Sequence, residues 1–80
     1  MPDQAHIVID VRNFVSWLSL LKVTQLFGEL QPLEILEVRG ADSDTKNDLF
    51  RILPKSAYHI LQLDYKDNDG LHQFQIQKQP

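Results

Sequence analysis

The last third of the chain limits more than any other part which folds this sequence can adopt. Residues 58–66 and 71–78 are two segments in which apolar and polar side chains alternate, and the tract between them, residues 67–70, reads DNDG. Alternation with period two indicates a strand with one buried face, and Asp, Asn and Gly together favour a tight reversal. We therefore predict an antiparallel hairpin over residues 58–78.

The register of this hairpin follows if residues 67–70 form the turn. Large apolar side chains then share one face, and a slip by one residue would move all of them to the other face. The predicted pairs are Tyr65–His72, Leu63–Phe74 and Leu61–Ile76. The opposite face would carry Ile60, Gln62, Asp64, Gln73, Gln75 and Gln77.

Residues 6–39 supply two further strands with a helix between them. Residues 6–11 and 35–39 are short β-branched or alternating runs, and residues 17–30 carry apolar side chains at helical spacing. A serine or asparagine side chain can cap a helix by accepting from a first-turn N–H, so we expect Asn13 or Ser16 in that role. The expected buried stripe of the helix is Leu20, Val23, Phe27 and Leu30, with Trp17 and Leu21 on its flank.

A polar loop, residues 41–48, leads into a second helix. Its capping candidates are Asp42, Ser43 and Asp44, and Pro54 lies at or near the helix end because proline disrupts a helix interior. The apolar residues of this helix are Leu49, Phe50, Ile52 and Leu53.

The order β-α-β-α-β-β predicts an α+β fold, a two-layer α/β sandwich. Two helices would pack on one face of a four-stranded mixed sheet, within a single domain spanning residues 1–80. The other face would stay open to solvent or to a weak contact. We expect a monomer, with a weak dimer through an exposed edge strand as the open alternative. This open face would include Val8, Ile35, Glu37 and Arg39.

Composition excludes several classes of protein. The 80 residues contain no cysteine, which removes disulfides, thiolate metal sites and thiol nucleophiles. The net charge of −3 argues against a nucleic-acid binder, because contacts to phosphate dominate such affinity. We find no apolar run long enough to span a bilayer and no signal peptide at residues 1–10, so we expect a cytoplasmic protein with no membrane association.

Four short motifs occur in a characteristic order. They are D-x-R at residues 10–12, LQPLEILEV at residues 30–38, an acidic loop that ends in Asp48-Leu49, and FQIQK at residues 74–78. Their order and spacing resemble the TusA/SirA-like sulfur-carrier family over nearly the whole chain. The resemblance implies the same β-α-β-α-β-β fold.

The departures from that family fall on its reactive site. The C-P-x-P motif of the family corresponds here to Ser16-Trp17-Leu18-Ser19, and Leu33 and Asn13 stand where the family has glycine. Ala57-Tyr58 replaces a pair similar to Gly-His. In the family the cysteine carries a persulfide, which requires a soft thiolate that a serine hydroxyl cannot supply. The resemblance therefore implies the fold and argues against the carrier chemistry.

The sequence shows no other catalytic or metal-binding pattern that could replace this carrier chemistry. Ser16 would need a base, yet no sequence signal places His6, His59 or His72 beside it, and these histidines lack metal-ligand spacing. We expect them to be semi-exposed structural residues. The loop aspartates, Asp42, Asp44 and Asp48, lack EF-hand spacing. We expect no enzyme activity, no catalytic residue, no metal and no cofactor.

Trp17 and Leu18 are the remaining candidates for function. They lie where the family presents its reactive cysteine to partner proteins, and aromatic anchors dominate the energy of protein interfaces. Trp17 could instead fold inward over a thin core, and Leu18, on the polar side of the helix, could be one ordinary exposed leucine. Our hypothesis is a partner-binding patch of Arg12, Ser16, Trp17 and Leu18.

The sequence thus favours a non-catalytic TusA/SirA-like domain that acts as a protein-interaction or regulatory module. Its partner would be a protein that the sequence does not identify. Two alternatives stay open: an accessory protein of a sulfur relay, and an RNA-binding domain. The second rests on the fold alone, which is shared with the C-terminal domain of a bacterial initiation factor.

Overall fold

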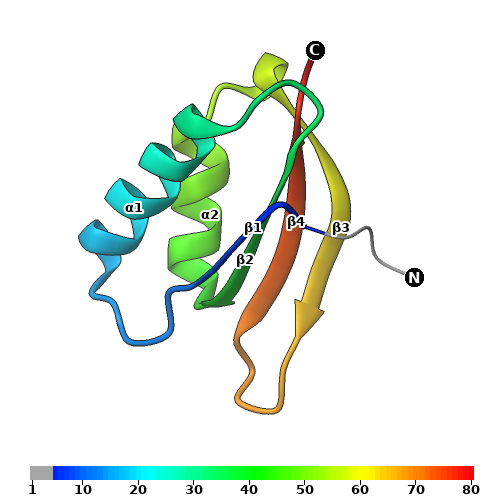
Figure 1. Cartoon of the computed structure of the whole chain (residues 1–80). Helices are drawn as coiled ribbons and strands as arrows, with labels where there is room; N and C mark the ends of the chain where they lie inside the picture. The colour runs from blue at the N-terminus through cyan, green and yellow to red at the C-terminus, as the bar shows by residue number, and fades with distance from the viewer. Residues whose placement is uncertain (1–4) are drawn as a thin grey trace.

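The computed structural model describes residues 5–80, except for the side chains of residues 62–65. It places two helices on one side of a four-stranded sheet (Figure 1), which confirms the predicted α+β sandwich and its element order. The expectation about a signal peptide involves residues 1–4, which lie outside the described part. The elements are β1 (Ile7–Asp10), α1 (Ser16–Glu29), β2 (Ile35–Ala41), α2 (Ser43–Ile52), a short 3-10 helix η1 (Lys55–Ala57), β3 (Tyr58–Lys66) and β4 (His72–Lys78).

The strand order in the sheet is β1-β2-β4-β3, so β1 and β3 are its edges. β1 runs parallel to β2, with α1 as the crossover between them, and β4 is antiparallel to both of its neighbours. In Figure 1 the start of α1, the start of α2 and the turn between β3 and β4 all lie at one end of the molecule. This end is where the candidate site is built.

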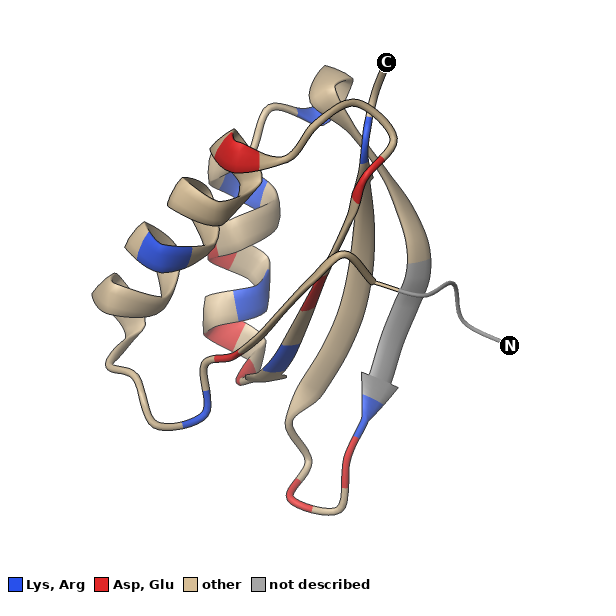
Figure 2. Cartoon of the chain, in the orientation of Figure 1, with Lys and Arg blue, Asp and Glu red and all other residues tan. Residues whose placement is uncertain are grey.

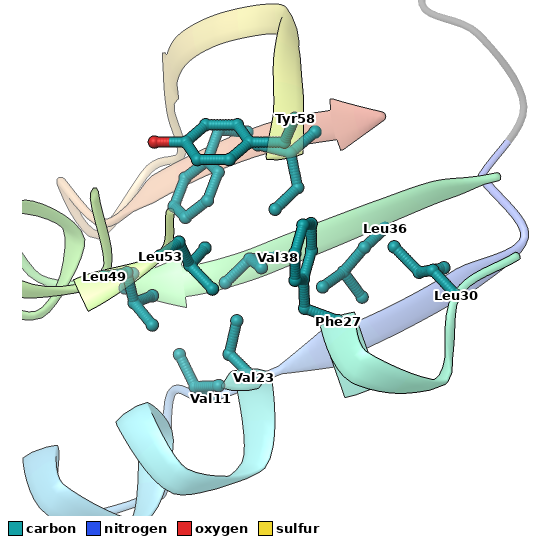
Figure 3. Close-up of a cluster of buried hydrophobic side chains, with 12 residues drawn as sticks. Val11, Val23, Phe27, Leu30, Leu36, Val38, Leu49, Leu53 and Tyr58 are labelled. Atoms are coloured by element: carbon teal, nitrogen blue, oxygen red, sulfur yellow. The ribbon is translucent and has the colours of Figure 1, made fainter. Parts of the chain in front are cut away.

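The core fills the space between the sheet and the two helices (Figure 3). The sheet contributes fully buried residues such as Leu36 and Phe74, as its alternation predicts. The stripe of α1 is rotated from the prediction, because Leu20 is only partly buried and Ser19 is buried in its place. The Ser19 hydroxyl lies 3.4 Å from the carbonyl oxygen of Val15, which gives this buried polar group a partner.

The hairpin turn is shorter than expected. The backbone N–H of Asp67 donates to the carbonyl of Leu71 at 2.9 Å, so the loop consists of the three residues between them. Gly70 ends this loop with φ of 77°, a left-handed conformation that glycine adopts at no steric cost.

The predicted register is therefore wrong by one residue next to the turn. Two irregularities in β3, on either side of Gln62, each add a residue to that strand and leave Leu61 unpaired with β4. Ile60 lies opposite Ile76 and so faces the helices, not the polar face. The predicted positions of the side chains of residues 62–65 lie outside the described residues. The observed pairs are Lys66–His72, Tyr65–Gln73, Gln62–Gln75, Ile60–Ile76, His59–Gln77 and Tyr58–Lys78.

The face of the sheet away from the helices is not simply open to solvent. Val8 and Arg39 are exposed, but Ile35 and Gln75 are buried and Glu37 is only 6 % exposed. The Glu37 carboxylate accepts a hydrogen bond of 2.8 Å from Gln75 Nε2 and is paired with the Arg39 guanidinium. These partners compensate its loss of water, which explains how a charged side chain can be buried there.

Charges of both signs are interspersed over the described part of the molecule. Figure 2 shows acidic and basic residues alternating along α2, where Arg51 lies 3.4 Å from Asp48. Arg12 is bound to a carboxylate of the hairpin turn, and Arg51 lies in the last turn of α2. Among residues 5–80, no helix is long and apolar enough to cross a membrane.

Candidate functional site

The start of α1 differs from its predicted capping. Val15 is the cap residue, and its carbonyl accepts from the backbone N–H groups of Leu18 and Ser19 at 3.0 Å each. Ser16 is the first residue of the helix itself, so neither it nor Asn13 occupies the cap position. Valine has no side-chain acceptor for the first-turn N–H groups, whereas serine or aspartate at a cap typically contributes about 1 kcal/mol. The stability of α1 therefore comes from its packing rather than from its N-terminus.

Large apolar side chains are exposed at and near this unfavourable cap. Trp17 is 67 % exposed, Val15 is 58 % exposed and Leu21 is 46 % exposed. Trp17 and Leu21 are four residues apart in one helix and so lie next to each other on its surface. We name Trp17 and Leu21 the helix-start patch.

Trp17 and Leu18, the two apolar residues of the hypothesised binding patch, therefore differ in their exposure to solvent. The alternative in which Trp17 folds over the core is wrong, since most of its surface faces solvent. Leu18, expected on the polar side, is half-buried, and Leu21 takes its place beside the indole. Ser16 is exposed in the first turn and shares this end of the helix with Trp17.

Arg12 does not belong to the helix-start patch, because its side chain is held by the hairpin. Its guanidinium lies 2.6 Å from a carboxylate oxygen of Asp67 and 3.2 Å from one of Asp69. The Asp10 carboxylate accepts from the backbone N–H of Arg12 at 2.9 Å. The D-x-R motif thus ties the loop between β1 and α1 to the turn between β3 and β4.

Gly40 makes room for this loop. It has φ of 73°, and a Cβ atom at this position would come within 2.8 Å of the Arg12 Cβ and 2.5 Å of an Asp10 carboxylate oxygen. Only glycine fits such a close approach with that backbone conformation. We did not single out Gly40 from the sequence, although a glycine inside a predicted strand signals a bulge or a close contact.

Two aspartates at this end of the molecule bind backbone N–H groups. Asp42 caps α2 as predicted, with its carboxylate accepting from Thr45 at 2.7 Å, and this hydrogen bond lowers the pKa of Asp42. Asp67 accepts from the backbone N–H of Leu71 at 3.0 Å. This bond is the main cause of the lowered pKa of Asp67, with Arg12 as a further cause. Both carboxylates are structural acceptors within the turns that they stabilise.

The three histidines lie apart and have different surroundings. His6 Nδ1 accepts from the backbone N–H of Ile35 at 3.1 Å, and His59 is exposed on β3. His72 is buried, which corrects its expected semi-exposed position, and its Nε2 is hydrogen bonded to Ser43 Oγ at 3.0 Å. Within the described residues, no group of three histidine, aspartate or glutamate side chains could hold a metal ion.

The Ser43–His72 contact resembles a nucleophile and its base in composition. Catalysis by such a pair also needs donors that stabilise an oxyanion. The first-turn donors beside Ser43 are already used, because Thr45 donates to the Asp42 carboxylate and Lys46 donates its backbone N–H to the Asp42 carbonyl. The contact is best explained as the hydrogen bond that satisfies a buried ring nitrogen.

Leu33 is another exposed apolar residue, and its backbone conformation is energetically unfavourable. It occupies the third position of a turn closed by the bond from the Glu34 N–H to the Gln31 carbonyl, and its φ is 72°. That position of such a turn requires a positive φ and favours glycine. The departure from the family's glycine that the sequence shows at Leu33 thus corresponds to backbone strain.

Comparisons of the chain with protein-family models, with curated proteins and with solved structures find no match. The relation to the TusA/SirA-like family therefore remains a prediction from the motifs.

Proposed function

We propose that this protein is a non-catalytic TusA/SirA-like domain that binds a partner protein through the helix-start patch. The observation that carries the proposal is the exposure of Trp17 in the first turn of α1. In this family, that turn presents the reactive cysteine to other proteins. The chain would keep the docking position and lack the sulfur chemistry, because Ser16 stands at the cysteine position.

The size of the indole supports a role in binding. A tryptophan side chain buries roughly 150–250 Å² when it is enclosed, and buried tryptophans are among the residues that contribute most to interfaces. Leu21, one turn further along α1, extends the apolar surface beside it. The partner would therefore offer an apolar socket for one indole ring, with room for aliphatic side chains at its rim.

The cluster around Arg12 supports the proposal in another way. Its ion pairs tie the loop that precedes α1 to the hairpin, and Trp17 itself lies in the first turn of a regular helix. A binding residue on an ordered element loses less conformational entropy on association than one on a mobile loop. We expect the first turn of α1 to be ordered before the partner binds.

The first experiment is a pull-down from the native host with the tagged wild-type chain and three variants. We expect the Trp17→Ala chain to lose a specific protein that the wild-type chain captures, and Trp17→Phe to retain part of it. Ile52→Ala is the matched control, because Ile52 is a similarly exposed apolar residue on α2. Removing an anchoring indole costs at least about 2 kcal/mol, or roughly 30-fold in affinity.

The stability of each variant is measured in parallel by urea unfolding. An exposed substitution changes the free energy of unfolding by about 0.5 kcal/mol or less, so lost binding in Trp17→Ala would not result from unfolding. Equal capture by the wild-type, Trp17→Ala and Ile52→Ala chains would refute the proposed binding surface. Size-exclusion chromatography tests whether the partner is a second copy of the chain, which would also contradict the proposal.

A further inference from the structure

A groove lies between α2 and the edge strand β3, with η1 at one end. It has a volume of about 540 Å³, within the range of roughly 300–1,000 Å³ that is usual for ligand sites. Its apolar lining comes from Phe50 of α2 and from Tyr58 and Ile60 of β3. The Phe50 and Tyr58 rings stack with centroids 6.3 Å apart, so they form a continuous apolar floor. The groove shares no residue with the helix-start patch.

Beside this groove, the backbone N–H and C=O groups of alternate β3 residues point outward, away from β4. Lys78 lies opposite Tyr58, but its backbone N–H and C=O point away from β3. They bond to Glu34 and Leu33 at 2.9 Å each. Hydrogen-bonded and non-hydrogen-bonded pairs alternate in an antiparallel ladder. Tyr58 and Ile60 are therefore in non-hydrogen-bonded pairs, and their N–H and C=O groups point to the edge of the sheet.

This edge has no strand neighbour among the described residues, since β3 is the last strand of the sheet order. An edge with outward N–H and C=O groups is a template for a further strand, and several protein families bind extended peptides in this way. In such complexes the backbone bonds supply affinity and the neighbouring pocket selects side chains. The α2–β3 groove is placed to receive one side chain of a strand added to Tyr58 and Ile60.

The charges at the groove select the kind of side chain. Lys55 of η1 is exposed at one end, and Lys46 of α2 also lines the groove. No aspartate or glutamate is among the described lining residues, although the whole chain has a net charge of −3. The exposed Lys55 ammonium beside an apolar floor complements an apolar side chain and a carboxylate that share one face of a strand.

We propose that the α2–β3 groove binds an extended acidic segment of a partner protein by strand addition to β3. One apolar side chain of the segment fills the space over Phe50 and Ile60, and a glutamate or aspartate two residues along, on the same face of the added strand, meets Lys55. Backbone bonds to Tyr58 and Ile60 hold the segment in the plane of the sheet. The proposal does not depend on the helix-start patch, and the two are tested with different variants.

The test is an NMR titration of the ¹⁵N-labelled chain with the acetylated and amidated hexapeptide Val-Thr-Glu-Thr-Val-Thr, whose valines and glutamate share one face of a strand. We expect the largest amide shifts at Tyr58, Ile60 and Phe50. Lys55→Glu should weaken binding about fivefold or more, the effect of an exposed ion pair of about 1 kcal/mol. Lys22→Glu is the matched control, because it reverses an exposed lysine on the outer face of α1, and it should leave the affinity unchanged.

Two further peptides separate the parts of the proposal. The same peptide with lysine in place of glutamate should bind more weakly, and equal affinity would overturn the charge argument. The glutamate peptide with N-methylated valines keeps the side chains and loses backbone donors, so it should not bind. Binding of this peptide, or shifts in the wild-type titration that avoid β3, would overturn strand addition. Thermal unfolding checks that the Lys55→Glu variant is folded. If that variant does not fold, Lys55→Ala replaces it, with a smaller expected loss of peptide affinity.

Discussion

Leu33 is the residue at which sequence and backbone conflict most clearly. A branched side chain at φ of 72° costs of order 1–2 kcal/mol, whereas glycine adopts this conformation freely. The Leu33 side chain is exposed and so contributes little packing in return. A strained, exposed apolar residue is a reason to suspect a role in contact with another molecule.

Leu33→Gly is expected to raise the free energy of unfolding by about 1 kcal/mol, because relief of strain exceeds the added entropy of the unfolded chain. Leu33→Ala is the control, since alanine keeps the strain and should give no gain. Urea unfolding at neutral pH measures both. A Leu33→Gly chain no more stable than Leu33→Ala would show that the turn is not strained.

Asp42 links stability to pH at the start of α2. Hydrogen bonds from Thr45 lower its pKa in the folded chain below the ordinary 3.8, so its contribution is complete above 3.8 and is lost as the pH falls further. Asp42→Asn keeps the cap but cannot titrate. We expect the stability difference between the wild-type and Asp42→Asn chains to change between about pH 5 and about pH 2.5 in urea unfolding. A difference that is constant over this range would contradict the lowered pKa.

At the scale of elements, the hairpin shows how far sequence can predict pairing. Alternation predicts both strands and their partner, because it depends only on which residues are apolar. The register depends on the turn, and the DNDG tract is compatible with loops of three or four residues. The structure has the three-residue loop, and the irregularities in β3 then move Ile60 to the helix side.

Amide hydrogen exchange tests the observed register. The N–H groups of Tyr58 and Ile60 point away from β4 and should exchange rapidly in the free chain. His59 and Gln77 form a hydrogen-bonded pair and should exchange slowly. Strong protection of Ile60 together with rapid exchange of His59 would require another register and would remove the open edge of the α2–β3 groove.

The candidate site was predictable where it depends on local chemistry. Asp42 is a cap because its side chain reaches N–H groups three residues away, and D-x-R was recognised as a motif. The exposure of Trp17 was not predictable, because helical spacing places it at the edge of the buried stripe and allows either orientation. The partners of Arg12 were equally hidden, since Asp67 and Asp69 are more than fifty residues away in sequence.

At the scale of the whole molecule, the two proposed surfaces lie on different parts of one small fold. The helix-start patch is apolar and belongs to α1, while the α2–β3 groove combines an apolar floor with lysines and an open strand edge. Under the two proposals, one partner that offers a segment to each surface would bind with a higher apparent affinity than through either contact alone.

The central claim is that Trp17 contacts a partner protein in the native host. The most direct measurement replaces Trp17 with a photo-crosslinking amino acid in cells of that host, and Ile52 in a parallel strain as the matched exposed position on α2. After irradiation, we predict one discrete adduct of a different protein at position 17 and none at position 52. No adduct at position 17, or the same adducts at both positions, would contradict the claim that the start of α1 is a binding surface.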